Sequence, residues 1–379
     1  MADELTPLEV AVGAALGFEP SRSERNGPVR SLWETLQDAC LPALRDPPAR
    51  VAFSGGRDSS LVLEAAVTAA RRHGLEPPVA VTLRFPAVPA ATESEWQELV
   101  ARHLSLADWV RVDLGDELDC LGPIATELVQ RDGARFPPNA HLVVPIARVG
   151  DGGSLITGLG GDELLGVWRW RARADMLSRR EPMRLRAVRG LALGTMPRPL
   201  RRAVVHRREG WVPPWLTREG KEQYVARARH EVDHPSRYDR YIDWVLGSRH
   251  LNVAVRRVAE VAQAEGVNAH APLLAPAFTG ALRAQGARHG FGDRSTAMAV
   301  IAGDRLPSAL LERAHKARFD DVFAGPRTRE FAQRWHGDGI DSQLVDLDAL
   351  RATWEAGELG VFRSMIAIQA AWRAEQRAH

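Results

Sequence analysis

Short apolar runs and longer amphipathic segments alternate along the first half of the chain, and this alternation restricts the fold more than any other feature. The short runs predict buried strands, and the longer segments predict helices with one apolar face. The predicted strands are Arg50–Ser54, Val79–Phe85, Trp109–Leu114 and Ser154–Thr157. The predicted helices between them are Asp58–His73, Glu93–Leu104 and Leu118–Gln130. This order favours an α/β fold with a doubly wound parallel sheet covered on both faces by helices.

The regions that flank this alternation are predicted to be mainly helical. Pro7–Leu16 and residues 28–46 each carry a helical pattern of apolar residues, and strand signals fade after about residue 165. We therefore expect an N-terminal arm, residues 1–27, followed by one domain, residues 28–379. The two parts of that domain are an α/β part and a mainly helical part, residues 28–170 and 171–379.

The composition is that of an ordinary globular protein. Of the 379 residues, 45% are hydrophobic and 26% are charged, which allows a sizeable core. No apolar stretch of about 18 residues predicts a membrane span, and Met1–Pro20 lacks the basic start of a signal peptide. Cys40 and Cys120 form neither a CxxC motif nor a zinc-binding spacing. These features predict a protein of the reducing cytoplasm.

The first predicted strand turns into a helix through Ser54-Gly-Gly-Arg-Asp-Ser59. The first amides of a helix lack partners within it and, together with the helix dipole, bind phosphate. Gly55 and Gly56 let the backbone approach an anion closely, and Asp58 supplies a carboxylate for Mg²⁺. The spacing is neither that of a P-loop nor GxGxxG. The alternative is an ordinary strand-to-helix turn in which Ser54 only caps the helix.

A second glycine-rich turn, Gly158-Leu-Gly-Gly-Asp-Glu163, follows the fourth predicted strand. By itself, the acidic pair at its end is compatible with the N-terminus of a helix, where the dipole favours negative charge. Together with the first loop, the turn indicates a nucleotide site. Asp58 and Asp162 would each supply one carboxylate to the Mg²⁺ that neutralises a bound triphosphate.

Both loops resemble those of known enzymes. Ser54–Ser59 resembles the SGGxDS loop of the ATP pyrophosphatase superfamily, which holds the β,γ-pyrophosphate while the bond between the α and β phosphates breaks. Leu155–Gly166 resembles the GxGxDELFGG segment of asparagine synthetases and their relatives, the β-lactam synthetases and lasso-peptide cyclases. This likeness covers about residues 30–330, including Ala91–Trp96, Ala271–Pro276 and Gly292–Phe319. It implies an adenine-nucleotide α-hydrolase-like fold and a synthetase domain.

The resemblance also implies a set of functional residues. Lys316, one of only two lysines in the chain, matches a lysine that family members place over the pyrophosphate and the acyl-adenylate. Lys316, Asp58 and Asp162 form the expected catalytic set, and the two aspartates are the expected Mg²⁺ ligands. The residues expected to bind ATP are Ser54, Gly55, Gly56, Asp58, Ser59, Ser60, Leu83, Gly158 and Gly160. Glu163 and Arg318 are expected to contact the substrate.

Two departures from the family pattern bear on the reaction. Asparagine synthetases begin with a glutaminase domain headed by a catalytic cysteine, whereas this chain begins Met1-Ala2 and has about 45 residues before its first predicted strand. The amine is therefore expected to be free ammonia, an amine of the substrate, or ammonia from a separate subunit. Asparagine synthetases have glutamate and β-lactam synthetases have tyrosine at the position of Leu159, and leucine cannot act as a general base. Leu159 therefore favours the lasso-peptide cyclases and similar tailoring enzymes.

These features predict an ATP-dependent amide ligase that forms AMP and pyrophosphate. The enzyme would adenylate a substrate carboxylate and pass the acyl group to an amine, in the biosynthesis of a peptide or amino-acid natural product, for example by macrolactam formation. The alternatives are ammonia-dependent amidation of the asparagine type and a non-catalytic peptide-binding relative. Leu159 and Ala275, the latter in place of an aspartate of the family, favour the non-catalytic relative. The presence of Asp58, Asp162 and Lys316 argues against it.

Other enzymes with the first loop fit less well. Sulfur-inserting tRNA enzymes need a reactive cysteine, and neither cysteine lies near a loop, Cys120 being in a predicted helix. An enzyme similar to NAD or GMP synthetases would share the first loop but would not account for Asp162–Gly166. Arg169–Arg208 carries thirteen arginines against Asp175 and Glu181, which predicts either a solvated helical face or a surface for a partner protein or leader peptide. No basic pattern interleaved with aromatic residues indicates nucleic-acid binding.

Overall fold

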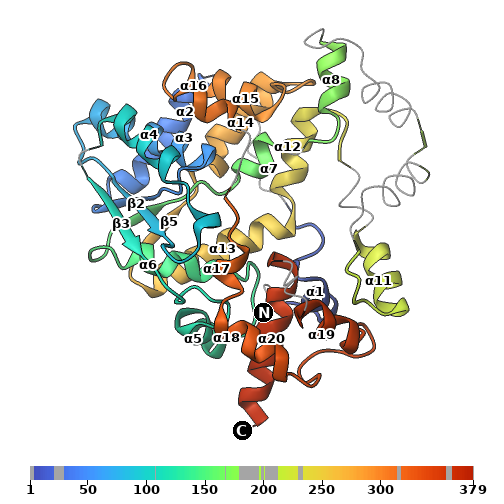
Figure 1. The fold of residues 1–379 in the computed structure, drawn as a ribbon. Coiled ribbons are helices and arrows are strands. Elements are labelled where there is room, and N and C mark those ends of the chain that lie inside the picture. The colour runs from blue at the N-terminus through green and yellow to red at the C-terminus, as the bar shows by residue number, and fades with distance from the viewer. Residues whose placement is uncertain are drawn as a thin grey trace.

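The computed structural model describes most of the chain and contains a five-stranded parallel sheet with helices packed around it (Figure 1). The described residues are 4–20, 30–106, 108–166, 168–178, 196–197, 200, 212–228, 234–313, 317–355 and 361–378, with only the backbone of 361–363 included. Lys316 and most of the arginine-rich stretch, residues 169–208, lie outside the described residues.

The sheet has the strand order β3-β2-β1-β4-β5, and all neighbouring strands run parallel. The strands are β1 Ala49–Ala52, β2 Val79–Arg84, β3 Trp109–Asp113, β4 Ser154–Ile156 and β5 Asn268–His270. Val51 of β1 pairs with Ala80 of β2 on one side and with Ile156 of β4 on the other. The strand order reverses between β1 and β4, which is where doubly wound sheets bind their ligands. The predicted fold class is therefore confirmed.

The fifth strand lies in the half of the chain where the sequence shows no strand signal. β5 has only three residues, Asn268-Ala-His270, and none of them is a large apolar residue. It forms because it lies beside β4, where Leu155 pairs with Ala269. The expectation of a mainly helical second half did not include this strand, because pairing with an existing strand edge replaces the missing local preference.

Helices cover both faces of the sheet. The core on one face contains Val51 and Ile156 with residues of α2 (Leu32–Leu44), α3 (Arg57–His73) and α14 (Pro276–Gly286). On the opposite face, Val81 and Leu155 pack with residues of α6 (Val143–Ala147) and α13 (Arg249–Ala264). Leu155 and Ile156 are neighbours on β4, so their side chains point to opposite faces.

A second body of helices forms around the two ends of the chain. There, α1 (Pro7–Val12) contacts α20 (Val361–Ala378), and α18 (Pro326–Arg334) contacts α19 (Leu347–Glu355), as Figure 1 shows. Buried Glu9 of α1 forms an ion pair with Arg249 of α13, which joins this body to the sheet domain. The predicted helix Pro7–Leu16 is too long, because Gly13 adopts a left-handed conformation and ends α1.

The remaining elements connect these layers. They are η1 Pro89–Ala91, α4 Ser94–Leu104, α5 Pro123–Asp132, η2 Ala140–Leu142, α7 Gly161–Leu165, α8 Arg171–Leu177, α11 Arg218–Ala228, α12 Tyr238–Leu246, η3 Pro272–Leu274, α15 Arg294–Ala302, α16 Ser308–Glu312 and α17 Asp320–Phe323. Cys120 lies in a turn before α5 and not in a helix, contrary to the prediction, because α5 begins only at Pro123. Proline is favoured in the first turn of a helix, where its missing N–H costs nothing.

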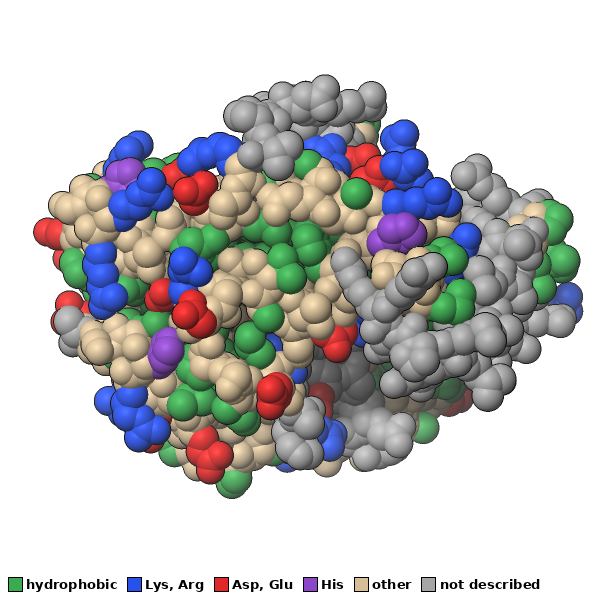
Figure 2. Space-filling model, turned by 90° about the horizontal axis from the view of Figure 1, so that it is seen from above, with side chains coloured by type: hydrophobic (Ala, Val, Ile, Leu, Met, Phe, Trp, Pro, Cys, Tyr) green, Lys and Arg blue, Asp and Glu red, His purple; other side chains and the backbone are tan. Residues whose placement is uncertain are grey.

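The surface carries both signs of charge. On the face drawn in Figure 2, basic and acidic side chains of the described residues are interspersed, in keeping with the net charge of +2. Within the described part of the chain, no helix has the length and apolar character needed to cross a membrane.

Candidate active site

The first glycine loop connects β1 to α3 at the carboxyl edge of the sheet. The hydroxyl oxygens of Ser54 and Ser59 lie 3.1 Å apart, and the amide of Gly56 donates to Ser54 Oγ at 3.2 Å. Gly55 has a φ of +80°, a conformation that side-chain-bearing residues rarely adopt. Gly56 is the N-cap of α3, so the positive end of the helix dipole faces this loop. The arrangement suits a phosphate group.

The second glycine loop connects β4 to α7 and contacts the first. A Cβ atom on Gly158 would lie 3.1 Å from the amide nitrogen of Ser59, and one on Gly161 would collide with the carboxyl group of Asp58. A side chain at position 161 would therefore displace the Asp58 carboxyl group where the two loops meet. This contact places Asp58, the second residue of α3, beside α7, whose first turn contains Asp162.

The two aspartates share one cation in this structure. The guanidinium of Arg294, the first residue of α15, donates from one nitrogen to Asp58 and from the other to Asp162. Burial by itself lowers the pKa of Arg294, but the charges and hydrogen bonds of the two carboxylates raise it above its ordinary value. A pair of carboxylates close enough to hold one cation fits Mg²⁺, which binds one or two carboxylates and takes its other ligands from phosphates and water.

Glu163 follows Asp162 in the first turn of α7. Burial, and then the nearby charges of Asp162 and Asp58, raise the pKa of Glu163 above its ordinary value. The backbone oxygen of Glu163 accepts a hydrogen bond from the Tyr241 hydroxyl at 2.7 Å. Tyr238 donates in the same way to Leu164, so α12 fixes the position of α7.

The two loops form one wall of a polar pocket of about 630 Å³. Among its lining residues are the charged side chains of Arg57, Asp58, Glu93, Asp162, Glu163, Arg294 and Arg313. Ser54, Gly56, Ser59, Gly158 and Gly160 also line it. The pocket thus combines hydroxyl groups, glycine amides and charges of both signs at the switch point between β1 and β4, which suits a bound triphosphate.

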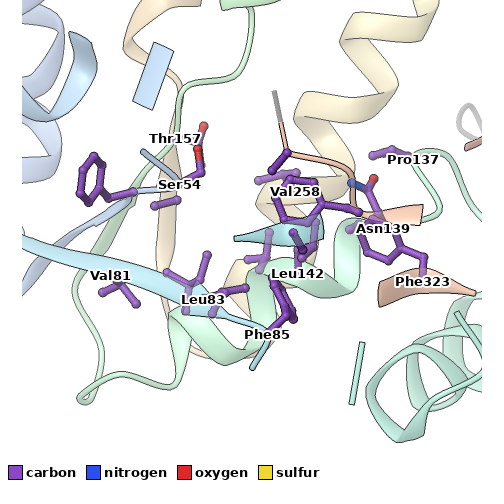
Figure 3. Close-up of a pocket in the computed structure, with 18 of the residues that line it drawn as sticks. Ser54, Val81, Leu83, Phe85, Pro137, Asn139, Leu142, Thr157, Val258 and Phe323 are labelled. Atoms are coloured by element: carbon purple, nitrogen blue, oxygen red, sulfur yellow. The ribbon is translucent and has the colours of Figure 1, made fainter. Parts of the chain in front are cut away.

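An apolar pocket of about 590 Å³, whose lining is drawn in Figure 3, shares part of its wall with the polar pocket. Its lining includes Leu83 of β2, Phe85 just after β2, Leu142, Val258 of α13 and Phe323. The residues that line both pockets are Ala52, Ser54, Leu142, Leu159 and Phe319. A nucleotide whose phosphates lie at the first loop therefore has an apolar space for its base close by.

The structure brings most of the predicted site residues together. Of the residues expected to bind ATP, those in the polar pocket are Ser54, Gly56, Asp58, Ser59, Gly158 and Gly160. Gly55 and Ser60 are buried, and Ser60 donates its hydroxyl hydrogen to Gly56 O at 2.8 Å, behind the loop. Leu83 and Arg318 line the apolar pocket, and Glu163 the polar one. Lys316 lies outside the described residues, so its role stays a prediction.

Arg294, Arg313 and Glu93 are site residues that the sequence did not assign. All three lie within segments that resemble the family, but their side chains reach the loops from positions distant along the chain. A signal existed for Glu93, an acidic residue at the start of a predicted helix. Nothing in the local pattern around the two arginines distinguishes them from the many other arginines of this chain.

Comparison with known proteins gives one result that agrees with this geometry. No curated protein matches the chain. The family model described as asparagine synthase matches residues 32–375, which include both glycine loops, Arg294 and every strand of the sheet. The chain therefore belongs to the asparagine synthase family.

Proposed function

We propose that this protein is an ATP-dependent amide ligase that forms AMP and pyrophosphate and acts on a peptide or amino-acid-derived carboxylate. Membership of the asparagine synthase family supports an ATP-dependent ligase that makes C–N bonds. The observation that carries the proposal is the meeting of the two glycine loops, with Asp58 and Asp162 on one cation beside the Ser54 and Ser59 hydroxyls.

In the proposed reaction, a carboxylate oxygen of the substrate attacks the α-phosphorus of ATP. The bond from that phosphorus to the β-phosphate oxygen breaks, and pyrophosphate leaves into the first loop. Ser54, Gly56 and Ser59 stabilise its charge, and Lys316 is the expected further donor. An amine then attacks the acyl carbon, loses a proton, and AMP departs with the electron pair of the acyl–oxygen bond. Positioning and charge stabilisation supply most of the rate acceleration in such transfers.

Asp58 and Asp162 are the residues that would hold Mg²⁺, which would neutralise the triphosphate charge. Both carboxylates also form ion pairs with Arg294. A metal ion held by these carboxylates would compete with the guanidinium, which could then pair with phosphate oxygens within the same pocket.

The nature of residue 159 supports a substrate unlike aspartate. Leu159 lies in the wall common to both pockets, so the polar pocket has an apolar surface there. We propose a peptide or amino-acid natural-product precursor, with an amine of the same molecule or ammonia as the acceptor. The described part of residues 169–208 includes Arg171 and Arg173 of α8, and we propose this basic stretch as the docking segment for a partner protein or leader peptide.

The first experiment is to measure pyrophosphate release from ATP with Mg²⁺, for the wild type and Asp162→Ala, across pooled amino acids and candidate peptides. Asp348→Ala is the matched control, because that carboxylate is exposed and remote from the loops. We expect release that requires a carboxylate substrate, is absent in Asp162→Ala and is unchanged in Asp348→Ala. Parallel reactions with and without ammonium separate amidation by ammonia from the use of a substrate amine.

Two results would contradict the proposal. ATP binding without pyrophosphate release, with every substrate and amine tried, would favour the non-catalytic peptide-binding alternative. Absence of ATP binding would show that the two loops do not form a nucleotide site.

A further inference from the structure

The backbone of the first glycine loop is held from outside the loop by two side chains. Gln97 of α4 donates from Nε2 to the carbonyl oxygen of Ser54 at 3.0 Å. Arg313, which follows α16, donates from Nη1 to the carbonyl oxygen of Gly55 at 2.9 Å. The carbonyl groups of two consecutive peptide units are therefore each held by a side chain from another element.

A trans peptide unit is planar, and its N–H points opposite to its C=O. Holding the Ser54 carbonyl therefore sets the direction of the Gly55 amide, and holding the Gly55 carbonyl sets that of the Gly56 amide. The Gly56 amide faces Ser54 Oγ at 3.2 Å, and both residues line the polar pocket. The conformation depends on glycine, because a Cβ atom on Gly55 would lie 2.7 Å from Cγ of Gln97.

Arg313 is itself held in a fixed position. Its guanidinium forms a buried ion pair with Glu93, each side chain being 5% exposed, and lies 5.2 Å from the ring centre of Trp96. Glu93 also accepts a hydrogen bond from the amide of Ala317 at 3.1 Å. In return, Arg57 of the loop donates to the carbonyl oxygen of Arg313. A planar guanidinium can serve Glu93 and Gly55 at the same time, which an ammonium group does poorly.

We propose that Gln97 and Arg313 are positioning residues that aim the amides of Gly55 and Gly56 at the β,γ-pyrophosphate of ATP. This inference rests on the proposed use of ATP and adds how the loop is given its phosphate-binding shape. Gln97 lines the apolar pocket and Arg313 the polar one, but the proposed role of each acts through the carbonyl group that it holds. Loss of the neutral Gln97 leaves the charges of the pocket in place but lets the peptide units rotate away from the phosphates.

The test uses Gln97→Met, which has nearly the same shape but lacks the amide donor. Calorimetric titration measures the affinity of the wild type and the variant for ATP, for inorganic pyrophosphate and for AMP. We expect ATP and pyrophosphate to bind about threefold to tenfold more weakly, the usual effect of one hydrogen bond. AMP lacks the β and γ phosphates, so its affinity is expected to stay unchanged.

Gln369→Met is the matched control. Gln369 is also buried and also donates Nε2 to backbone carbonyls, those of Cys120 and Pro138, both at 3.3 Å. It is expected to leave all three affinities unchanged. Arg313→Lys provides an independent variant that keeps the positive charge beside Glu93, and it is expected to show the same selective loss.

If Gln97→Met weakened AMP binding as much as ATP binding, this would show a general loss of structure and overturn the inference. Unchanged affinity for ATP and pyrophosphate would also overturn it. These failures are separate from failure of the proposed function. If the wild type binds ATP and releases pyrophosphate while the affinities of Gln97→Met are unchanged, only the positioning role is disproved. If the wild type binds neither ATP nor pyrophosphate, both the positioning role and the proposed function are disproved.

Discussion

Asp58 and Asp162 bind the same guanidinium group although they come from different loops on different strands. Their common partner, Arg294, is 236 positions from Asp58 along the chain. The two carboxylates would repel each other without a cation between them. A divalent cation bound by the same two carboxylates would compete with this guanidinium, so we expect Arg294 to determine the affinity for metal.

We predict that Arg294→Met increases the affinity of the nucleotide-free protein for a divalent cation. Opposite charges at about 4 Å attract by ~4 kcal/mol at an effective dielectric constant of about 20, so even a third of that corresponds to about tenfold in affinity. Mn²⁺ binding measured by electron paramagnetic resonance checks this directly without turnover. Arg327→Met, at an exposed pair with Asp116, is the control. Unchanged Mn²⁺ affinity would show that Arg294 does not compete with the metal.

We predict that Gly161→Ala damages the site more than the fold. The added methyl group would collide with the Asp58 carboxyl group, so α7 or Asp58 must shift. Such overpacking costs about 1–3 kcal/mol, and the shift separates the two carboxylates. Pyrophosphate release is expected to fall at least about tenfold, because displaced charges no longer stabilise the transition state. Thermal unfolding reports the stability change in the same samples.

Gly280→Ala is the matched control for this substitution. Gly280 lies within α14, and a Cβ atom there would meet only Arg283, at 3.9 Å. Alanine in the interior of a helix is more favourable than glycine by roughly 0.5–1 kcal/mol. This variant is expected to raise the melting temperature slightly and to keep full activity. Equal activity of the two glycine variants would contradict the role of the contact between the loops.

The sequence predicts the strands and loops of this site well because their signals are local. Each of β1 to β4 is an apolar run followed by turn residues, and the structure places each within three residues of its predicted bounds. The carboxylates of Asp58 and Asp162 meet because parallel neighbouring strands end at one edge of the sheet. Once β1 and β4 are neighbours in a parallel sheet, the contact between the two loops that follow them is expected.

The parts that the sequence does not predict depend on contacts between distant segments. β5 is a strand only because β4 offers an edge for pairing, and its own three residues carry no strand preference. Arg294 and Arg313 follow no periodic pattern, and their roles arise from where α15 and α16 end up in space. Periodicity shows which residues are buried, but it carries no information on which distant loop a charged side chain reaches.

We predict that Glu163→Gln stabilises the protein at high pH. Burial raises the pKa of Glu163 from its ordinary value of 4.5, so the folded state holds the proton more tightly than the unfolded state. The stabilising contribution of that proton is complete below pH 4.5 and is lost as the pH rises through the raised pKa. The neutral glutamine is free of this loss. Melting temperatures of the wild type and the variant are expected to agree near pH 4 and to favour the variant at pH 8.

The exposed residue Glu222 supplies the control for this prediction. Glu222→Gln is expected to show the same difference from the wild type at both pH values. A Glu163→Gln variant that gains nothing between pH 4 and pH 8 would show that Glu163 keeps its ordinary acidity in the folded protein.

We predict, finally, that the buried pair of Arg313 and Glu93 contributes to both stability and ATP binding, whereas a similar pair elsewhere contributes to stability alone. Removing one partner of a buried ion pair leaves an uncompensated charge and typically costs about 3–5 kcal/mol. Arg313→Met is expected to show this loss in denaturant unfolding, together with weaker ATP binding. Arg249→Met removes the partner of buried Glu9, far from the loops, and is expected to match the stability loss while ATP affinity is retained. Combining Arg313→Met with Glu93→Gln removes the unpaired charge and is expected to restore part of the stability but not the ATP affinity, since the donor to Gly55 is still missing.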